Sequence, residues 1–191
     1  PSVAYHQGEL FVAWQQDVTP YDVVQAIYAK RYTGSSWQEA GVGAASNFGV
    51  GGVRRYVMQP QLASDGGELY ITYNDNLTIS QTGPDIRLYA RRWNGTSFVE
   101  DVEGDASADG LSLDTRDSSH VAMTVDASGR PWVVWQESGT DSSEIFLQSQ
   151  SVEGTGLILF ADSQTSVQDL LDQNDLGLGD QIIVTASQAA G

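Results

Sequence analysis

The chain has 191 residues, of which 25 are acidic and 9 basic, so its formal net charge is -16. A surface this acidic repels nucleic-acid phosphates and anionic membranes, which excludes binding to either by charge, and it attracts cations instead. The sequence has no cysteine, which excludes disulfides and thiolate sites, and it has no apolar run of about 18 residues that could insert into a membrane.

An aromatic residue at the end of an alternating apolar run occurs three times. These residues are Trp14, Tyr73 and Trp135, spaced about sixty residues apart, and a polar pair follows each of them. The apolar runs before them lie at residues 10–13, 69–72 and 131–134. Self-similarity at a fixed period indicates a repeat architecture, in which each repeat is one small structural unit.

A second landmark follows each of these aromatic residues. Residues 26–37 (AIYAKRYTGSSW) match residues 87–98 (RLYARRWNGTSF), and residues 144–157 form a weaker third copy. Each copy predicts a strand that ends in a glycine turn. Because both landmarks keep their spacing in every copy, chance similarity is a poor explanation.

One repeat unit predicts four short strands. Period-two alternation and bounding turn residues place them, in the first copy, at residues 2–5, 9–15, 25–32 and 37–39. The first two strands of each copy form a hairpin whose turn contains Gly8, Gly67 or Gly129, since glycine takes the positive φ that such turns need. Asp65 and Asp126 open two of these turns, where we expect their carboxylates to accept backbone N–H bonds.

Three such units predict an all-β protein of β-propeller-type blades. A four-stranded antiparallel unit has two apolar faces to cover, and stacking units around an axis covers them. We expect the repeats at residues 1–59, 60–120 and 121–157, followed by a C-terminal tail at residues 158–191. Propellers have about four to eight blades, so three make an incomplete propeller. Further blades from the same or another chain complete the ring, or the three units form another β arrangement. Pro1 begins within a repeat, from which we expect a longer protein.

The third copy carries the phrase D-x-S-G-x-P-W-V-x-W between Asp126 and Trp135, and the earlier copies carry Y-A-x-R-[YW]-x-G-x-S-[WF] at residues 28–37 and 89–98. Over residues 1–157 these phrases resemble the blades of secreted bacterial β-propellers of the sialidase-like, Asp-box-related type, although the usual T-W ending of the Asp box is absent. The resemblance implies a propeller fold and an extracellular or cell-surface bacterial location. It is only weakly specific for an activity.

The tail carries a different phrase, D-L-L-x-x-N-D-x-x-x-G-D, from Asp169 to Asp180. It resembles the start of a cadherin-like, VCBS-type module of giant calcium-dependent adhesins. The residues alone also allow a short helix at 167–171, a glycine-rich turn and a strand at 181–186.

Two acidic groups are candidate calcium sites. Asp105, Ser107, Asp109 and Gly110 follow the D-x-[DNS]-x-[DNS]-G pattern, in which alternate oxygens turn inward and glycine makes the sharp turn. Arg116 stands where a twelve-residue calcium loop has an acid. A solvated acidic loop and turn-capping carboxylates are the alternatives. The candidate Ca²⁺ ligands are Asp105, Ser107, Asp109, Asp114, Asp172, Asp175 and Asp180.

The repeated aromatic residues are expected to pack in the core or between blades, with sugar stacking as the alternative. His6 and His120 lack a second ligand at metal or triad spacing, so both are expected at turns or on the surface. The connections at residues 41–57 and 99–119 are long enough to carry function.

A sialidase-like hydrolase is the enzymatic alternative. Its chemistry would need clustered arginines for a substrate carboxylate and a Tyr–Glu nucleophile pair. Arg91 and Arg92 are adjacent on a predicted strand, so their side chains face opposite sides. No arginine spacing singles out a site, and the sequence predicts neither a catalytic residue nor a defined ligand-binding residue.

These features together favour a non-enzymatic binding or adhesion module of a large secreted or cell-surface bacterial protein. A glycan or a protein is the expected ligand, and Ca²⁺ the expected stabilising ion. Neither nucleic acid nor membrane insertion is expected. A sialidase-like glycoside hydrolase and a purely structural spacer are the alternatives.

Overall fold

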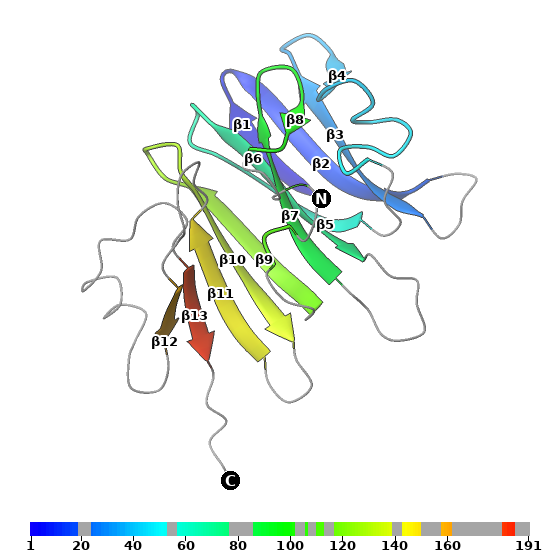
Figure 1. Cartoon of the computed structure of the whole chain (residues 1–191). Helices are drawn as coiled ribbons and strands as arrows, with labels where there is room; N and C mark the ends of the chain where they lie inside the picture. Colours follow the sequence, from blue (N-terminus) through cyan, green and yellow to red (C-terminus); the bar gives the residue numbers. More distant parts are fainter. Residues whose placement is uncertain are drawn as a thin grey trace.

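The computed structural model describes residues 1–18, 24–52, 57–76, 86–101, 106, 110–112, 117–138, 143–149, 158–161 and 181–185, the last two segments by their backbone alone. Within these ranges every regular element is a β-strand. They contain no helix with the length and apolar character to cross a membrane. The prediction of an all-β protein is confirmed (Figure 1).

The strands form three sheets that lie side by side in chain order (Figure 1). Blade 1 contains β1 (Ser2–His6), β2 (Glu9–Asp17), β3 (Gln25–Tyr32) and β4 (Trp37–Glu39). Blade 2 contains β5 (Val57–Ser64), β6 (Leu69–Asn76), β7 (Ile86–Trp93) and β8 (Phe98–Val99). Blade 3 contains β9 (Asp117–Val125), β10 (Pro131–Ser138), β11 (Ser143–Ser149), β12 (Ile158–Ala161) and β13 (Gln181–Thr185). Blades 1 and 2 are antiparallel meanders, and their strand order is the chain order.

Blade 3 takes its outer strand from the C-terminal tail. β13 lies antiparallel to β11, in the place that β4 takes beside β3 and β8 takes beside β7. β12 runs parallel to β13 at the edge of the sheet. The predicted strand at 181–186 agrees with β13, whereas the alternative helix at 167–171 lies outside the described residues. The division of the chain after residue 157 stays a prediction.

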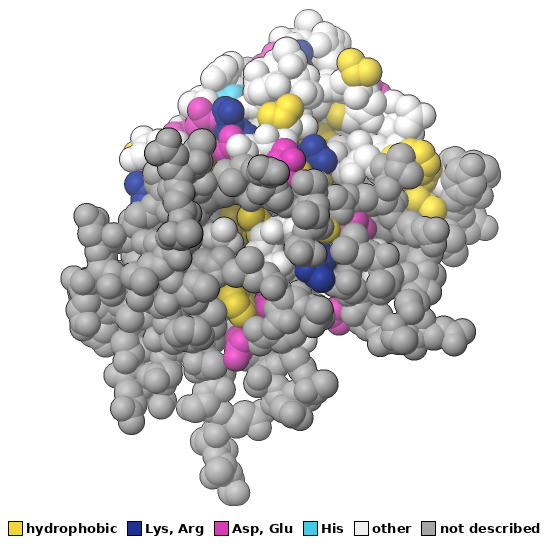
Figure 2. Space-filling model, viewed as in Figure 1, with side chains coloured by type: hydrophobic (Ala, Val, Ile, Leu, Met, Phe, Trp, Pro, Cys, Tyr) yellow, Lys and Arg dark blue, Asp and Glu magenta, His cyan; other side chains and the backbone are white. Residues whose placement is uncertain are grey.

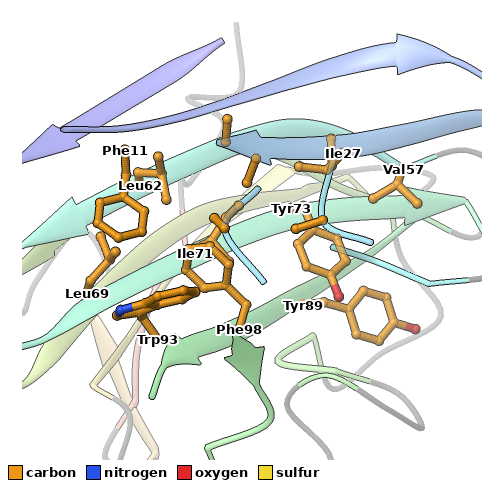
Figure 3. Close-up of a cluster of buried hydrophobic side chains, with 14 residues drawn as sticks. Phe11, Ile27, Val57, Leu62, Leu69, Ile71, Tyr73, Tyr89, Trp93 and Phe98 are labelled. Carbon is orange, nitrogen blue, oxygen red and sulfur yellow. The ribbon is translucent and has the colours of Figure 1, made fainter. Parts of the chain in front are cut away.

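Neighbouring blades pack face to face. Because side chains alternate along a strand, each blade has a forward face, toward the next blade, and a backward face, toward the preceding one. Phe11, Ala13 and Ile27 on the forward face of blade 1 pack against Leu69 and Ile71 on the backward face of blade 2 (Figure 3). Full burial of one large aliphatic side chain contributes about 1.5–3 kcal/mol, so this interface is a main source of stability.

The same contact recurs between blades 2 and 3. Leu88, at the position of Ile27, and Ala90 lie on the forward face of blade 2. They pack against Val133 and Trp135 on the backward face of blade 3. The chain therefore contains one type of inter-blade interface twice.

A cross-strand aromatic pair marks the same position in every blade. An aromatic residue on the second strand lies opposite one on the third strand, with ring centroids 6.0 Å apart in blade 1, 5.9 Å in blade 2 and 5.5 Å in blade 3. The pairs are Trp14–Tyr28, Tyr73–Tyr89 and Trp135–Phe146. The three residues that the sequence places in register are structurally equivalent, so the repeat in the chain is a repeat in space.

The hairpin turns use glycine as predicted, with one correction. Gly8 and Gly129 have φ values of +86° and +80°, but in blade 2 the positive φ belongs to Gly66 (+98°) and not to Gly67. The turn of blade 1 is a tight one between the paired residues His6 and Glu9, whereas the turn of blade 2 runs over residues 65–68. The longer turn moves the left-handed position by one residue.

Carboxylates close the two longer turns, which confirms the prediction for Asp65 and Asp126. Asp65 accepts the N–H groups of Glu68 and Gly67 at 2.7 and 2.8 Å. These bonds stabilise the ionised form, so the pKa of Asp65 lies below its ordinary value. Asp126 accepts the Trp132 indole N–H at 3.0 Å and the backbone N–H groups of residues 128 and 130, and its pKa is lowered for the same reason.

Candidate ligand-binding site

A pocket of about 370 Å³ lies where the first strands of the three blades meet. The packing of β5 against β1, and of β9 against β5, brings these strands together. All three blades contribute to this hollow, which we name the inner-strand pocket. Its lining residues are Pro1, Gln15, Gln59, Pro60, Gln61, His120 and Val121.

Two β-bulges supply lining residues of the inner-strand pocket. The pairing of β5 with β6 is interrupted between Met58 and Gln61, and the pairing of β9 with β10 is interrupted opposite Trp135. Gln59 and His120 are the first residues of these bulges, with φ values of +55° and +52°. Left-handed backbone costs a non-glycine residue about 1–2 kcal/mol. Bulges and strain of this kind cluster at functional sites.

Glutamine side chains form a hydrogen-bonded chain beside the pocket. The bulge removes the Gln59 N–H from the sheet ladder, and Gln15 Oε1 accepts it at 3.4 Å. Gln15 Nε2 donates to Gln25 Oε1 at 2.7 Å, and Gln25 Nε2 donates to Asp17 Oδ1 at 3.0 Å. This chain orients the Gln15 amide. An amide has both donors and acceptors, so the pocket can pair with ligand hydroxyls in either sense.

An equivalent amide joins blades 2 and 3. Asn74 occupies the position of Gln15, directly after the register aromatic residue, and its Nδ2 donates to the backbone oxygen of Ser118 at 3.1 Å. Asn74 is fully buried, and within the described part of the chain its Oδ1 has no hydrogen-bond partner. The first residue of the polar pair thus links its blade to the first strand of the next blade in both cases.

The second residue of the polar pair holds the aromatic side chain. The indole N–H of Trp14 donates to Gln16 Oε1 at 3.0 Å, and that of Trp135 donates to Glu137 Oε1 at 2.9 Å. Trp135 and Tyr73 are fully buried between blades. Their predicted packing role is confirmed, while Trp14 remains partly exposed.

The two histidines have different surroundings. His120 is exposed at the pocket, as predicted for a surface residue. His6 lies at a turn, because it pairs with Glu9 across the hairpin, but it is not on the surface. It is buried between blades 1 and 2, with its Nδ1 3.1 Å from Ser64 Oγ and its ring edge-on to Phe11. The end of β1 turns into the inter-blade interface there. Burial lowers the pKa of His6 below its ordinary value, although the nearby carboxylate of Glu68 opposes the shift.

The arginines of β7 are engaged within the protein. Arg91 Nε donates to the Tyr73 hydroxyl at 3.0 Å, on the opposite side of the strand from the Arg92 contacts, as predicted. Arg92 forms ion pairs with Asp101 and, at 3.3 Å, with Glu68. In the view of Figure 2, Lys or Arg side chains lie beside Asp or Glu side chains on the described part of the surface.

The predicted calcium ligands cannot be placed from the structure. All seven, in residues 105–114 and 172–180, lie outside the described residues. Among the residues that are described, no three Asp, Glu, His or Cys side chains gather as a metal site would require. The calcium sites stay predictions.

Gly110, the last residue of the first calcium motif, has a structural role of its own. It has a φ of +71°, and a Cβ there would lie 2.2 Å from the carbonyl oxygen of Leu88. Gly49 has a φ of +63°, and its Cβ would lie 2.1 Å from the carbonyl oxygen of Ile27. The residue after each glycine donates its N–H to that same oxygen, at 2.7 and 2.8 Å. The acidic residues of the motif are not needed to explain Gly110, because the loop of Gly49 lacks them.

Sequence reasoning missed the inner-strand pocket. One signal was present, since Pro60 interrupts a strand pattern and proline inside a strand indicates an edge or a bulge. No such signal marks His120. Its bulge arises from the pairing of β9 with β10 and has no residue type of its own.

No protein-family model and no curated protein matches the sequence. Among solved structures, the crystal structure of a thermostable family-43 glycoside hydrolase is similar, with a TM-score of 0.50 and 14% sequence identity. The match covers 99% of this chain and 53% of that chain, so this chain spans about half the length of that enzyme. That enzyme is a five-bladed β-propeller, and identity this low carries the fold alone. The chain is therefore an all-β protein built of β-propeller-type blades.

Proposed function

We propose that the chain is a glycan-binding part of a larger secreted or cell-surface bacterial protein, and that its ligand occupies the inner-strand pocket. The observation that carries this proposal is the meeting of three first strands at a pocket whose polar lining residues are Gln15, Gln59, Gln61 and His120. Similarity in fold to a glycoside hydrolase adds support.

The chemistry of the lining favours a small neutral polar ligand. The pocket volume falls within the range of about 300–1,000 Å³ that small-molecule sites occupy. Amide and imidazole groups donate and accept hydrogen bonds, which suits the closely spaced hydroxyls of a sugar. A glycan fits this concave site better than a protein surface does, because protein interfaces are larger and flatter.

A glycan array followed by calorimetric titration of its hits tests the proposal. Gln15→Ala and His120→Ala are expected to weaken binding at least about tenfold, because each removes a hydrogen-bonding group from the pocket. Gln38→Ala is the matched control, since Gln38 is an exposed strand glutamine on β4, outside the lining. Equal affinity in all three variants would refute this site.

Glycoside hydrolysis is the second candidate, favoured by the fold of the similar structure. A panel of chromogenic sialosides, galactosides and other pyranosides separates the two functions. Turnover that is lost when one carboxylate is changed would replace the binding proposal with an enzymatic one. Binding without turnover supports the first proposal, and an array without hits supports a purely structural spacer.

Calcium stabilisation and a role in adhesion complete the proposal. The excess of acidic residues and the motif at residues 105–110 support calcium binding, and the resemblance of residues 169–180 to an adhesin module supports adhesion. At matched ionic strength, CaCl₂ is expected to raise the melting temperature above its value in NaCl, because a ligand that binds only the folded state stabilises it. Asp109→Asn should reduce the difference, and Asp117→Asn, which lies outside both motifs, should retain it. Equal melting temperatures in the two salts would exclude a calcium site.

A further inference from the structure

A second pocket, of about 380 Å³, lies between blades 1 and 2 at the end where their hairpin turns meet (Figure 1). We name it the turn pocket, and residues 6–7, 67–68 and 92–95 line it. β1 runs from the inner-strand pocket, at Pro1, to the turn pocket, at His6, and its five residues span about 16 Å. The two pockets are therefore separate sites at opposite ends of the blades.

One guanidinium serves two carboxylates beside the turn pocket. Arg92 Nε donates to Asp101 Oδ1, and Arg92 Nη1 donates to Glu68 Oε2 at 3.3 Å. Asp101 also accepts the Tyr70 hydroxyl at 3.4 Å, and its side chain is 13% exposed. Glu68 lines the pocket, and its side chain is 38% exposed. These three charged side chains carry one negative charge more than they neutralise, and the excess is accessible at Glu68.

The other charged groups near the pocket do not offset this excess. Glu9 is paired with Arg31 at 2.9 Å, and backbone N–H groups hold Asp65 in its ionised form. Burial keeps the pKa of His6 below its ordinary value, so its imidazole is uncharged at pH 7. The pocket therefore disfavours an anionic ligand and favours a cationic group at Glu68.

Neutral polar groups lie around this carboxylate. Gln7 Nε2 donates to the carbonyl oxygen of Gly67 at 3.3 Å, which links the turns of blades 1 and 2. Asn94 Oδ1 accepts the backbone N–H groups of residues 96 and 97, each at 2.9 Å, and these bonds orient its amide. Amides donate and accept hydrogen bonds, so these two side chains suit ligand hydroxyls.

The Glu68 side chain is also packed against the turn of blade 3. A Cβ on Gly129 would lie 3.0 Å from Glu68 Cγ. This packing and the contact with Arg92 restrict the carboxylate before any ligand binds, which reduces the entropy lost on binding.

We propose that the turn pocket is a second ligand site, which binds an amino sugar with its protonated amine on Glu68 and its hydroxyls on Gln7 and Asn94. The volume lies within the range of about 300–1,000 Å³ that small-molecule sites occupy. A hydrogen bond between an ammonium and a carboxylate is about twice as strong as one between neutral groups, so the amine is the group that this pocket selects. The site does not depend on the glycan proposed for the inner-strand pocket.

Calorimetric titration with three monosaccharides tests this site. At pH 7 and equal ionic strength, glucosamine should bind at least about tenfold more tightly than glucose or N-acetylglucosamine, because only glucosamine carries a charged amine. Glu68→Gln keeps the size of the side chain and should weaken glucosamine binding at least about tenfold. Asp17→Asn is the matched control, since it removes the same charge from an exposed residue outside the pocket. It should leave the affinity unchanged.

Two further variants separate the two pockets. Gln15→Ala and His120→Ala should leave glucosamine binding unchanged, and circular dichroism checks that every variant is folded. Equal losses in Glu68→Gln and Asp17→Asn would assign binding to the overall charge of -16 and overturn the site. Loss of glucosamine binding in the inner-strand variants would also overturn it, as would no binding at about 20 mM glucosamine. A lysine amide that binds as tightly as glucosamine would overturn the assignment to a sugar.

Discussion

Gln59 and His120 hold left-handed backbone conformations that glycine adopts without strain. We expect His120→Gly to raise the free energy of unfolding by about 0.5–1 kcal/mol, because relief of about 1–2 kcal/mol of strain exceeds the added entropy of the unfolded glycine. The same variant should weaken glycan binding. Urea denaturation measures the first effect and calorimetric titration the second.

His120→Ala is the control for this prediction, because alanine removes the imidazole and retains the backbone strain. It should weaken binding without a gain in stability. A glycine variant that is less stable than the natural protein would mean that the bulge is not strained and that its conformation needs no functional explanation.

His6 gives the protein a pH dependence of known sign. Its folded-state pKa lies below the unfolded value because burial disfavours the imidazolium form. The unfolded chain therefore binds the proton first as the pH falls, and stability is lost on acidification through the ordinary histidine range near 6.5 and below it, until the folded state also protonates. We expect the melting temperature to fall between about pH 7.5 and pH 5.5.

His6→Gln should flatten this pH profile while keeping a polar group beside Ser64 Oγ. His120→Gln is the matched control, since that imidazole is exposed, and it should leave the profile unchanged. A profile that keeps its slope in the His6 variant would assign the acid sensitivity to other groups.

At the scale of elements, the loops that follow β4 and β8 are fixed by one glycine each. Gly49→Ala and Gly110→Ala are expected to lower the free energy of unfolding by at least about 2 kcal/mol, because the new Cβ would overlap a carbonyl oxygen as well as strain the backbone. Gly52→Ala is the control, since Gly52 has a similar φ of +73° with open space around it. It should cost only the strain, about 1 kcal/mol. Equal losses in the three variants would rule out the close contact as the cause.

The strands of this protein could be predicted from sequence because short apolar runs bounded by turn residues are typical of strands, whether one face is buried or both are, as in β6. The predicted ends of β3 and β4 agree with the structure, and β1 and β2 extend slightly beyond their predicted ends. In the turn between β5 and β6, the positive φ was predicted at Gly67 but lies at Gly66. The two glycines have the same conformational freedom, and only the pairing of Ser64 with Leu69 selects between them.

The candidate site was less accessible to prediction for a physical reason. The inner-strand pocket depends on which strands meet and on where a bulge interrupts their pairing, and neither is a local property of the sequence. The burial of His6 likewise depends on the position of Ser64 in the next blade. The repeat period, by contrast, can be read directly from the sequence, and it identified the equivalence of Trp14, Tyr73 and Trp135.

At the scale of the whole molecule, stability comes from the contact between consecutive blades. Among the described residues, blades 1 and 2 each bury their forward face against the backward face of the next blade. The clusters of Phe11 with Leu69 and of Leu88 with Trp135 are separate, and no single core connects all three sheets among the described residues. Loss of one interface should therefore destabilise the blades on either side of it most.

The net charge of -16 opposes the compact state through repulsion between like charges. We expect the melting temperature to rise by several degrees between about 0.05 M and 0.5 M NaCl, because the screening length falls from about 14 Å to about 4 Å. The partly exposed ion pairs Arg31–Glu9 and Arg92–Glu68 weaken over the same range, but each such pair contributes only about 1 kcal/mol. A melting temperature that falls with salt in the natural protein would show that the ion pairs outweigh the overall repulsion.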